Sequence, residues 1–135
     1  MYHPGSRNSW LTAIGPNPTR DPRDRGYARL YRSVFHTDPT TGFSVLSFDA
    51  ANIEIDALVK ALTSGRRPAT LADLREAVRA NVAAAHYQGI GGAGHFDANG
   101  DTTNHVISMW RVSGRTAHSH QWLGYSPGFA PHRTP

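Results

Sequence analysis

The chain has 135 residues, which is enough for one ordinary domain and too few for two. It contains no cysteine, so disulfide bonds, thiolate metal sites and cysteine nucleophiles are excluded. The formal net charge of +4 comes from residues 1–35, which hold six arginines against two aspartates, and no apolar run reaches the length of a membrane-spanning helix.

The N-terminal part predicts an arm followed by a helix. Residues 1–20 contain Pro and Gly too often for a regular element, so we expect an irregular basic arm. A helix is expected to begin near Asp21, which suits an N-cap, with Pro22 in the first helical position. One apolar helical face is formed by Tyr27, Leu30, Tyr31, Val34 and Phe35.

Two more helices are expected in the middle of the chain. The first spans about residues 44–63, and its apolar residues predict one broad face: Leu46, Ala50, Ile53, Ala57, Leu58, Ala61 and Leu62. The second begins at a capping box made by Thr70 and Asp73 and ends by Ala85. Leu71, Leu74, Val78 and Val82 should face one way, with Arg75 and Arg79 in solvent.

The remainder predicts β-structure and turns. Glycines at 89, 91, 92 and 94 predict a bend that allows close backbone approach, and residues 97–101 predict a turn with positive φ at Gly100. Strands are expected over residues 105–112 and 116–123, joined by a tight turn at 113–115. The fold class is therefore α/β, with three helices followed by a small antiparallel β-hairpin region.

The order and spacing of four pieces resemble a known family. Residues 87–92 read Tyr-Gln-Gly-Ile-Gly-Gly, and residues 96–101 read Phe-Asp-Ala-Asn-Gly-Asp before a strand, a glycine turn and a closing strand. Before them come the expected helix at 27–35, which ends in an aromatic residue, Phe-Asp-Ala at 48–50 near the start of the long expected helix, and the next expected helix at 71–82. This arrangement resembles the C-terminal part of the type I periplasmic binding proteins, the substrate-binding components of branched-chain amino acid ABC transporters.

The resemblance covers about residues 24–124 and implies a partial periplasmic-binding-protein-like I fold. With the composition of the two ends, it divides the chain into an irregular basic arm at 1–20, a C-terminal segment of a solute-binding domain at 21–124, and a flexible tail at 125–135. The implied function is that of a truncated or split solute-receptor fragment, which binds a small molecule such as an amino acid, needs no cofactor and is not an enzyme. The implied partners are a missing N-terminal receptor portion or a transporter permease.

The resemblance assigns no ligand-binding residue, because most ligand-contacting positions of the family lie upstream of the matching region. Family members are exported, to the periplasm or the cell surface. The N-terminus of this chain lacks the charged start and apolar core of a secretory signal, so the chain as it stands is expected to remain in the cytoplasm. Membrane insertion is not expected.

Eight histidines suggest a metal site as an alternative. His118 and His120 should share one face of a strand, and His95 and His105 flank the turn, so that three imidazoles with Asp97 or Asp101 could bind zinc. The competing interpretation, exposed polar positions on an antiparallel sheet, is the one we favour, so no metal ligand is assigned.

Three other kinds of site fit the sequence poorly. Asp97, Asn99 and Asp101 have the wrong spacing for an EF-hand, so these side chains are expected to cap the amides of their own turn. The glycine-rich stretch leads out of a helix and into a strand, the wrong order for a phosphate loop. No serine lies in a nucleophile elbow, so no catalytic residue is assigned.

The Arg-rich N-terminal arm leaves a second alternative open, a nucleic-acid-binding or regulatory module. The first 25 residues lack the interleaved aromatic residues of a nucleic-acid platform. We therefore expect no nucleic-acid partner.

Overall fold

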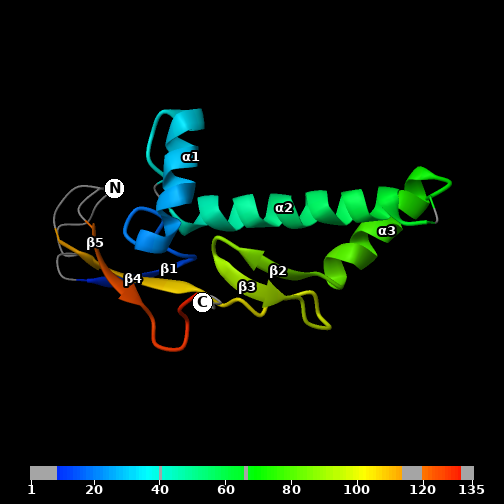
Figure 1. The fold of residues 1–135 in the computed structure, drawn as a ribbon. Coiled ribbons are helices and arrows are strands. Elements are labelled where there is room, and N and C mark those ends of the chain that lie inside the picture. The colour runs from blue at the N-terminus through cyan, green and yellow to red at the C-terminus, as the bar shows by residue number, and fades with distance from the viewer. Residues whose placement is uncertain (1–8, 40, 66, 114–119, 132–135) are drawn as a thin grey trace. The chain divides into compact units, whose positions relative to one another are not determined.

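The computed structural model describes residues 9–39, 41–65, 67–113 and 120–131 (Figure 1). Its contacts divide these residues into two compact units. Unit 1 comprises residues 9–45 and 105–131, and unit 2 comprises residues 46–104. Among the described residues, no helix is both long enough and apolar enough to cross a bilayer.

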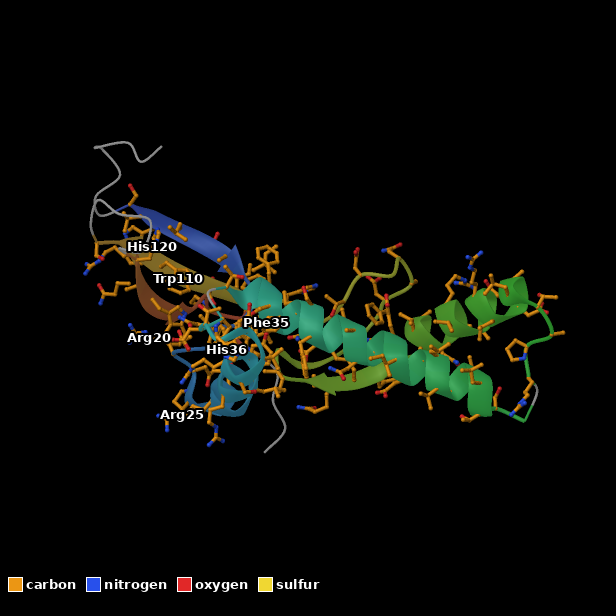
Figure 2. The ribbon with its side chains drawn as sticks, turned by 90° about the horizontal axis from the view of Figure 1, so that it is seen from above. Arg20, Arg25, Phe35, His36, Trp110 and His120 are labelled. Carbon is orange, nitrogen blue, oxygen red and sulfur yellow. The ribbon has the colours of Figure 1, made fainter. Side chains whose placement is uncertain are left out.

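Unit 1 contains a three-stranded antiparallel sheet. Strand β4 (Ile107–Val112) lies between β1 (Trp10–Ile14) and β5 (His120–Tyr125). Trp110 and His120 come from the two neighbouring strands β4 and β5 (Figure 2). A 3-10 helix, η2 (Pro22–Asp24), leads directly into helix α1 (Arg25–Phe35).

A close approach of two glycines shapes unit 1. Gly15 has a φ of 93°, and a Cβ at this position would lie 2.9 Å from the carbonyl carbon of Gly42. The Gly15 amide donates to the Val106 carbonyl at 2.8 Å, and the Ser108 hydroxyl donates to the Gly15 carbonyl at 2.7 Å. Only glycine fits here, because the position needs both a left-handed backbone and an absent side chain.

Unit 2 is built on the long helix α2 (Gly42–Thr63), whose first turn belongs to unit 1. Helix α3 (Leu71–Ala83) is tied to α2 by the side-chain amide of Asn81, which donates to the Ala57 carbonyl at 3.0 Å. The predicted capping box of α3 is confirmed, since the Asp73 amide donates to Thr70 Oγ1 and the Thr70 amide donates to the Asp73 carboxylate.

A two-stranded hairpin completes unit 2. Strands β2 (His86–Gly89) and β3 (Gly92–His95) pair antiparallel, with Gly89 opposite Gly92 at the closed end. The turn after β3 is as predicted: Gly100 has a φ of 87°, and Asp97 Oδ1 accepts hydrogen bonds from the amides of Asn99 and Asp101.

The prediction of an irregular arm over residues 1–20 is wrong for residues 10–14, which form β1. The five residues alternate between exposed and half-buried, but only pairing with β4, about a hundred residues later, makes them a strand. Asp21 is likewise not an α-helical N-cap. It is buried, and its carboxylate accepts a hydrogen bond from the Tyr125 hydroxyl at 2.9 Å.

The C-terminal predictions also need correction. Residues 86–95 form a hairpin rather than a simple bend after α3. The expected tail at 125–135 begins inside β5, and the Ser126 amide still donates to the Ile107 carbonyl at 2.9 Å. The predicted turn at 113–115 and the first part of the expected strand at 116–123 lie largely outside the described residues.

The predicted apolar helix faces are only partly correct. In α2, Ala57 and Ala61 are buried whereas Leu58 and Leu62 are exposed, so the expected single broad face is two faces. In α1, Tyr27 is buried, but its expected companions Leu30, Val34 and Phe35 are all more than half exposed. In α3, Leu71 is exposed. Spacing identifies apolar faces but not what covers them.

We predict that Gly100→Val destabilises the chain far more than Asp101→Ala. A Cβ at Gly100 would meet no neighbouring atom within 4 Å, so the cost comes from forcing a β-branched residue into positive φ, about 1–3 kcal/mol. Asp101 contributes its backbone amide to the turn, and this amide remains in Asp101→Ala. Urea unfolding of both variants measures the difference; equal losses of stability would show that the turn is not strained by valine.

Candidate functional site

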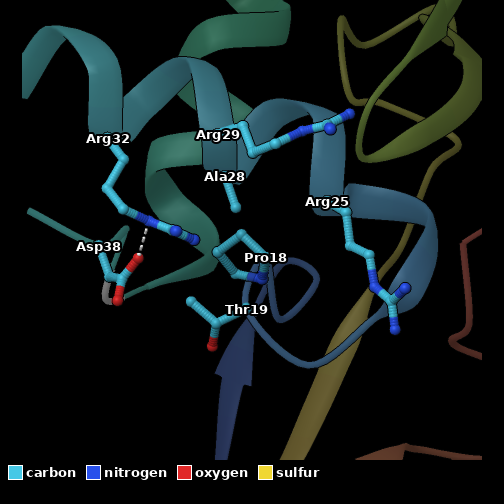
Figure 3. Close-up of a pocket in the computed structure, with 7 residues that line it drawn as sticks. All are labelled: Pro18, Thr19, Arg25, Ala28, Arg29, Arg32 and Asp38. Atoms are coloured by element: carbon cyan, nitrogen blue, oxygen red, sulfur yellow. Dashed lines mark ion pairs between the residues drawn. The ribbon is translucent and has the colours of Figure 1, made fainter.

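A cavity with a volume of about 650 Å³ lies beside α1 in unit 1 (Figure 3). Its lining comes from three neighbouring segments: the loop before η2, helix α1 and the turn after α1. The seven residues that line it are Pro18, Thr19, Arg25, Ala28, Arg29, Arg32 and Asp38.

Three arginines make this cavity basic. Helical spacing places Arg25, Arg29 and Arg32 three or four residues apart, so all three border the same side of α1. Arg32 Nε forms an ion pair with Asp38 Oδ1 at 2.6 Å, and both side chains are more than half exposed. In Figure 3 the side chains of Arg25 and Arg29 extend away from Pro18 rather than toward one another.

This geometry suits weak attraction of an anionic group. An exposed ion pair contributes little, because water and salt screen it. Specific recognition of a carboxylate requires donors that converge in a desolvated pocket, and the arginines here do not converge. The sequence shows these arginines only as part of a basic region, because their common location depends on where Pro18 and Asp38 fold.

A smaller cavity of about 390 Å³ lies on the hairpin of unit 2. The imidazole rings of His86 and His95 stack across the two strands with centroids 5.2 Å apart. Thr103 Oγ1 lies 3.3 Å from His95 Nδ1 and 3.2 Å from the His95 carbonyl oxygen. The remaining lining residues are Tyr87, Ala93 and Gly94.

Within the described residues, the zinc ligands considered from the sequence do not come together. His95 pairs with His86, which the sequence analysis did not consider, because the antiparallel register of β2 and β3 places them opposite each other. Asp97 instead binds amides of its own turn. His118 lies outside the described residues, and within them no group of three His, Asp or Glu side chains is placed to bind a metal.

A buried polar contact of unit 2 is made by Asp49, near the start of α2. Its buried carboxylate accepts hydrogen bonds from the amides of Ile90, at 2.9 Å, and Gly91, at 2.7 Å. A Cβ on Gly89 would lie 2.3 Å from Asp49 Oδ2. The prediction that these glycines allow close backbone approach is thereby confirmed, and the approaching group is a carboxylate 40 residues earlier.

We predict that Asp49→Ala lowers the free energy of unfolding by at least about 2 kcal/mol, because two amides lose their acceptor in a buried position. Asp56→Ala is the matched control: Asp56 is exposed on the same helix, and its removal should cost no more than about 0.5 kcal/mol. Chemical denaturation measures both. If the two variants were equally stable, Asp49 would not hold the hairpin loop.

Comparisons with known proteins give similarity in structure but not in sequence. No family model and no curated protein matches the sequence. The chain matches the crystal structure of the leucine-binding protein LivK from Thermotoga maritima with a TM-score of 0.60 and 16% identity, over 89% of this chain and 31% of that one.

Two further matches have the same character. An ABC transporter substrate-binding protein from Desulfitobacterium hafniense in complex with Leu matches with a TM-score of 0.61 and 18% identity, over 87% of this chain and 32% of that one. A solute-binding protein of an ABC transporter from R. palustris in complex with benzoate matches with a TM-score of 0.57 and 18% identity, over 95% of this chain and 31% of that one.

The chain has part of the fold of a type I periplasmic binding protein. It spans about a third of the length of the receptors it matches. The predicted fold class, α/β with three helices and small antiparallel sheets, is confirmed. The matched structures are solute-binding proteins, and the chain resembles one part of such a receptor rather than its whole.

Proposed function

We propose that this chain contributes one part of a solute receptor, and that it performs no chemistry on the bound solute. The observation that carries this proposal is the match of most of the chain to about a third of several receptor structures. The remaining receptor portion and a transporter permease are its proposed partners. Receptors of this family act outside the cytoplasmic membrane, and we propose the same location for the assembled receptor.

The proposed solute is a small carboxylate with an apolar body, such as an amino acid. The bound ligands named for two matched receptors, Leu and benzoate, share this chemistry. In a two-lobed receptor the ligand is enclosed between the lobes, and closure desolvates its polar groups. The basic cavity beside α1 is open and exposed, so it cannot supply that enclosure by itself.

We predict that the isolated chain binds no amino acid or benzoate more tightly than about 1 mM, a free energy near −4 kcal/mol. Half of the ligand's polar groups would remain in water, so their desolvation and orientation would contribute little affinity. Calorimetry against a panel of these solutes measures this, with the intact Desulfitobacterium hafniense receptor as positive control for Leu. A saturable, stoichiometric, micromolar solute would contradict the proposal.

A chimeric receptor provides the second arm of this test. In it, the present chain replaces the segment of the Desulfitobacterium hafniense receptor that it matches. If the chain is a receptor part, the chimera should bind a carboxylate of the panel saturably while the isolated chain does not. A folded chimera that binds none of them would overturn the proposed function.

A further inference from the structure

Helix α2 carries two apolar stripes on opposite sides. At 3.6 residues per turn, Leu46, Ile53, Ala57 and Ala61 share one side and are buried or half-buried within unit 2. The residues of the opposite side recur at spacings of three and four, and all are exposed. We call this set the outer stripe: Phe48, Ala51, Ile55, Leu58, Val59 and Leu62.

The outer stripe is large and uninterrupted. Phe48 and Leu58 are 37% and 39% exposed, and Ile55, Val59 and Leu62 are between 47% and 57% exposed. Glu54 borders it on one side and Asn52 on the other, so the stripe itself contains no charged side chain. Burying five such side chains would contribute substantially to stability, which makes their exposure costly in the isolated chain.

Two apolar stripes indicate a helix that lies between two layers. A helix on the surface of a domain needs one apolar face, whereas a helix that is apolar on opposite sides is enclosed. Within unit 2, α3 and the β2–β3 hairpin lie on one side of α2 (Figure 1). The second layer is not supplied by the described residues of this unit, whose sheet has two strands.

We propose that the outer stripe is the docking surface for the remaining portion of a type I solute-receptor fold, presented as the apolar face of a β-sheet. This inference rests on the proposed function. The chain matches over 89% of its own length but over only 31% of the Thermotoga maritima receptor, so most of that fold lies outside the matched segment. In α/β folds, helices cover the faces of the sheet, and a sheet face is what an exposed apolar helix stripe fits.

Two other occupants fit the stripe less well. Helices that lie on membranes carry Lys and Arg on the polar face, but α2 holds one Lys against three acidic residues, Asp49, Glu54 and Asp56. A second copy of α2 in a coiled coil would need only a narrow seam with a repeat of seven. Val59 makes the outer stripe wider than such a seam. A wide stripe fits the broad face of a β-sheet better than a second helix.

The chain has no cysteine, so a single introduced thiol can report on the outer stripe. Leu58→Cys places the thiol on the stripe, and Lys60→Cys places a control thiol two residues away on another, exposed side of α2. In the isolated chain both thiols should react with a maleimide at similar rates. In the chimeric receptor, the Leu58→Cys thiol should react at least about tenfold more slowly, because the sheet must first move away from the outer stripe. The rate of the Lys60→Cys thiol should be unchanged.

Three results would overturn the docking proposal. The first is equal reactivity of Leu58→Cys in the chimera and in the isolated chain, and the second is a chimera that shows no cooperative melt. The third is protection in the isolated chain that disappears on dilution, which would identify a second copy as the occupant. Labelling needs no solute, so a protected stripe in a chimera that binds no carboxylate would overturn the proposed function and leave the docking surface in place.

Discussion

The organisation of unit 2 depends on the contact between the Asp49 carboxylate and the loop that joins β2 to β3. A buried carboxylate must be fully hydrogen-bonded, and the amides of Ile90 and Gly91 meet that need. The contact requires a glycine at 89, because any side chain there would collide with Asp49. The side-chain amide of Asn104 donates to the Gly91 carbonyl at 3.1 Å and holds the same loop.

This contact explains why a short hairpin can persist in the chain. An isolated two-stranded hairpin is marginally stable in water, and β2 and β3 have only four residues each. Asp49 connects the hairpin to the longest helix, and Asn81 connects the same helix to α3. One side of α2 is therefore held against α3 and the hairpin by hydrogen bonds, whereas the outer stripe of the same helix is exposed. That asymmetry is what a partial receptor fold produces.

The sequence predicts local features well. The capping box at Thr70, the positive φ of Gly100 and the bounds of α2 depend on residues close together in the chain, and the structure has all three within a few residues. Strand β1 could not be predicted in the same way, because its partner β4 is far away in the sequence and its own residues include polar and small ones.

Sites were harder to predict than elements, because a site depends on contacts between distant residues. His95 was grouped with other histidines by proximity in sequence, but the hairpin register gives it His86 as a neighbour. The sequence shows Asp49 only as the middle residue of a family-like Phe-Asp-Ala motif and predicts no role for it. Its partners become visible when the fold places Gly89 against it. Similarly, the spacing in α2 shows apolar residues on two sides but does not show which side the chain covers.

Amide hydrogen exchange in the unmodified chain tests most directly whether the Asp49 carboxylate organises unit 2. If the Asp49 carboxylate holds the hairpin loop, the amides of Ile90 and Gly91 should exchange as slowly as the helical amides in the middle of α2, because both then need the opening of the whole unit. Exchange of Ile90 and Gly91 at the rate of unstructured peptide amides, while α2 remains protected, would contradict it.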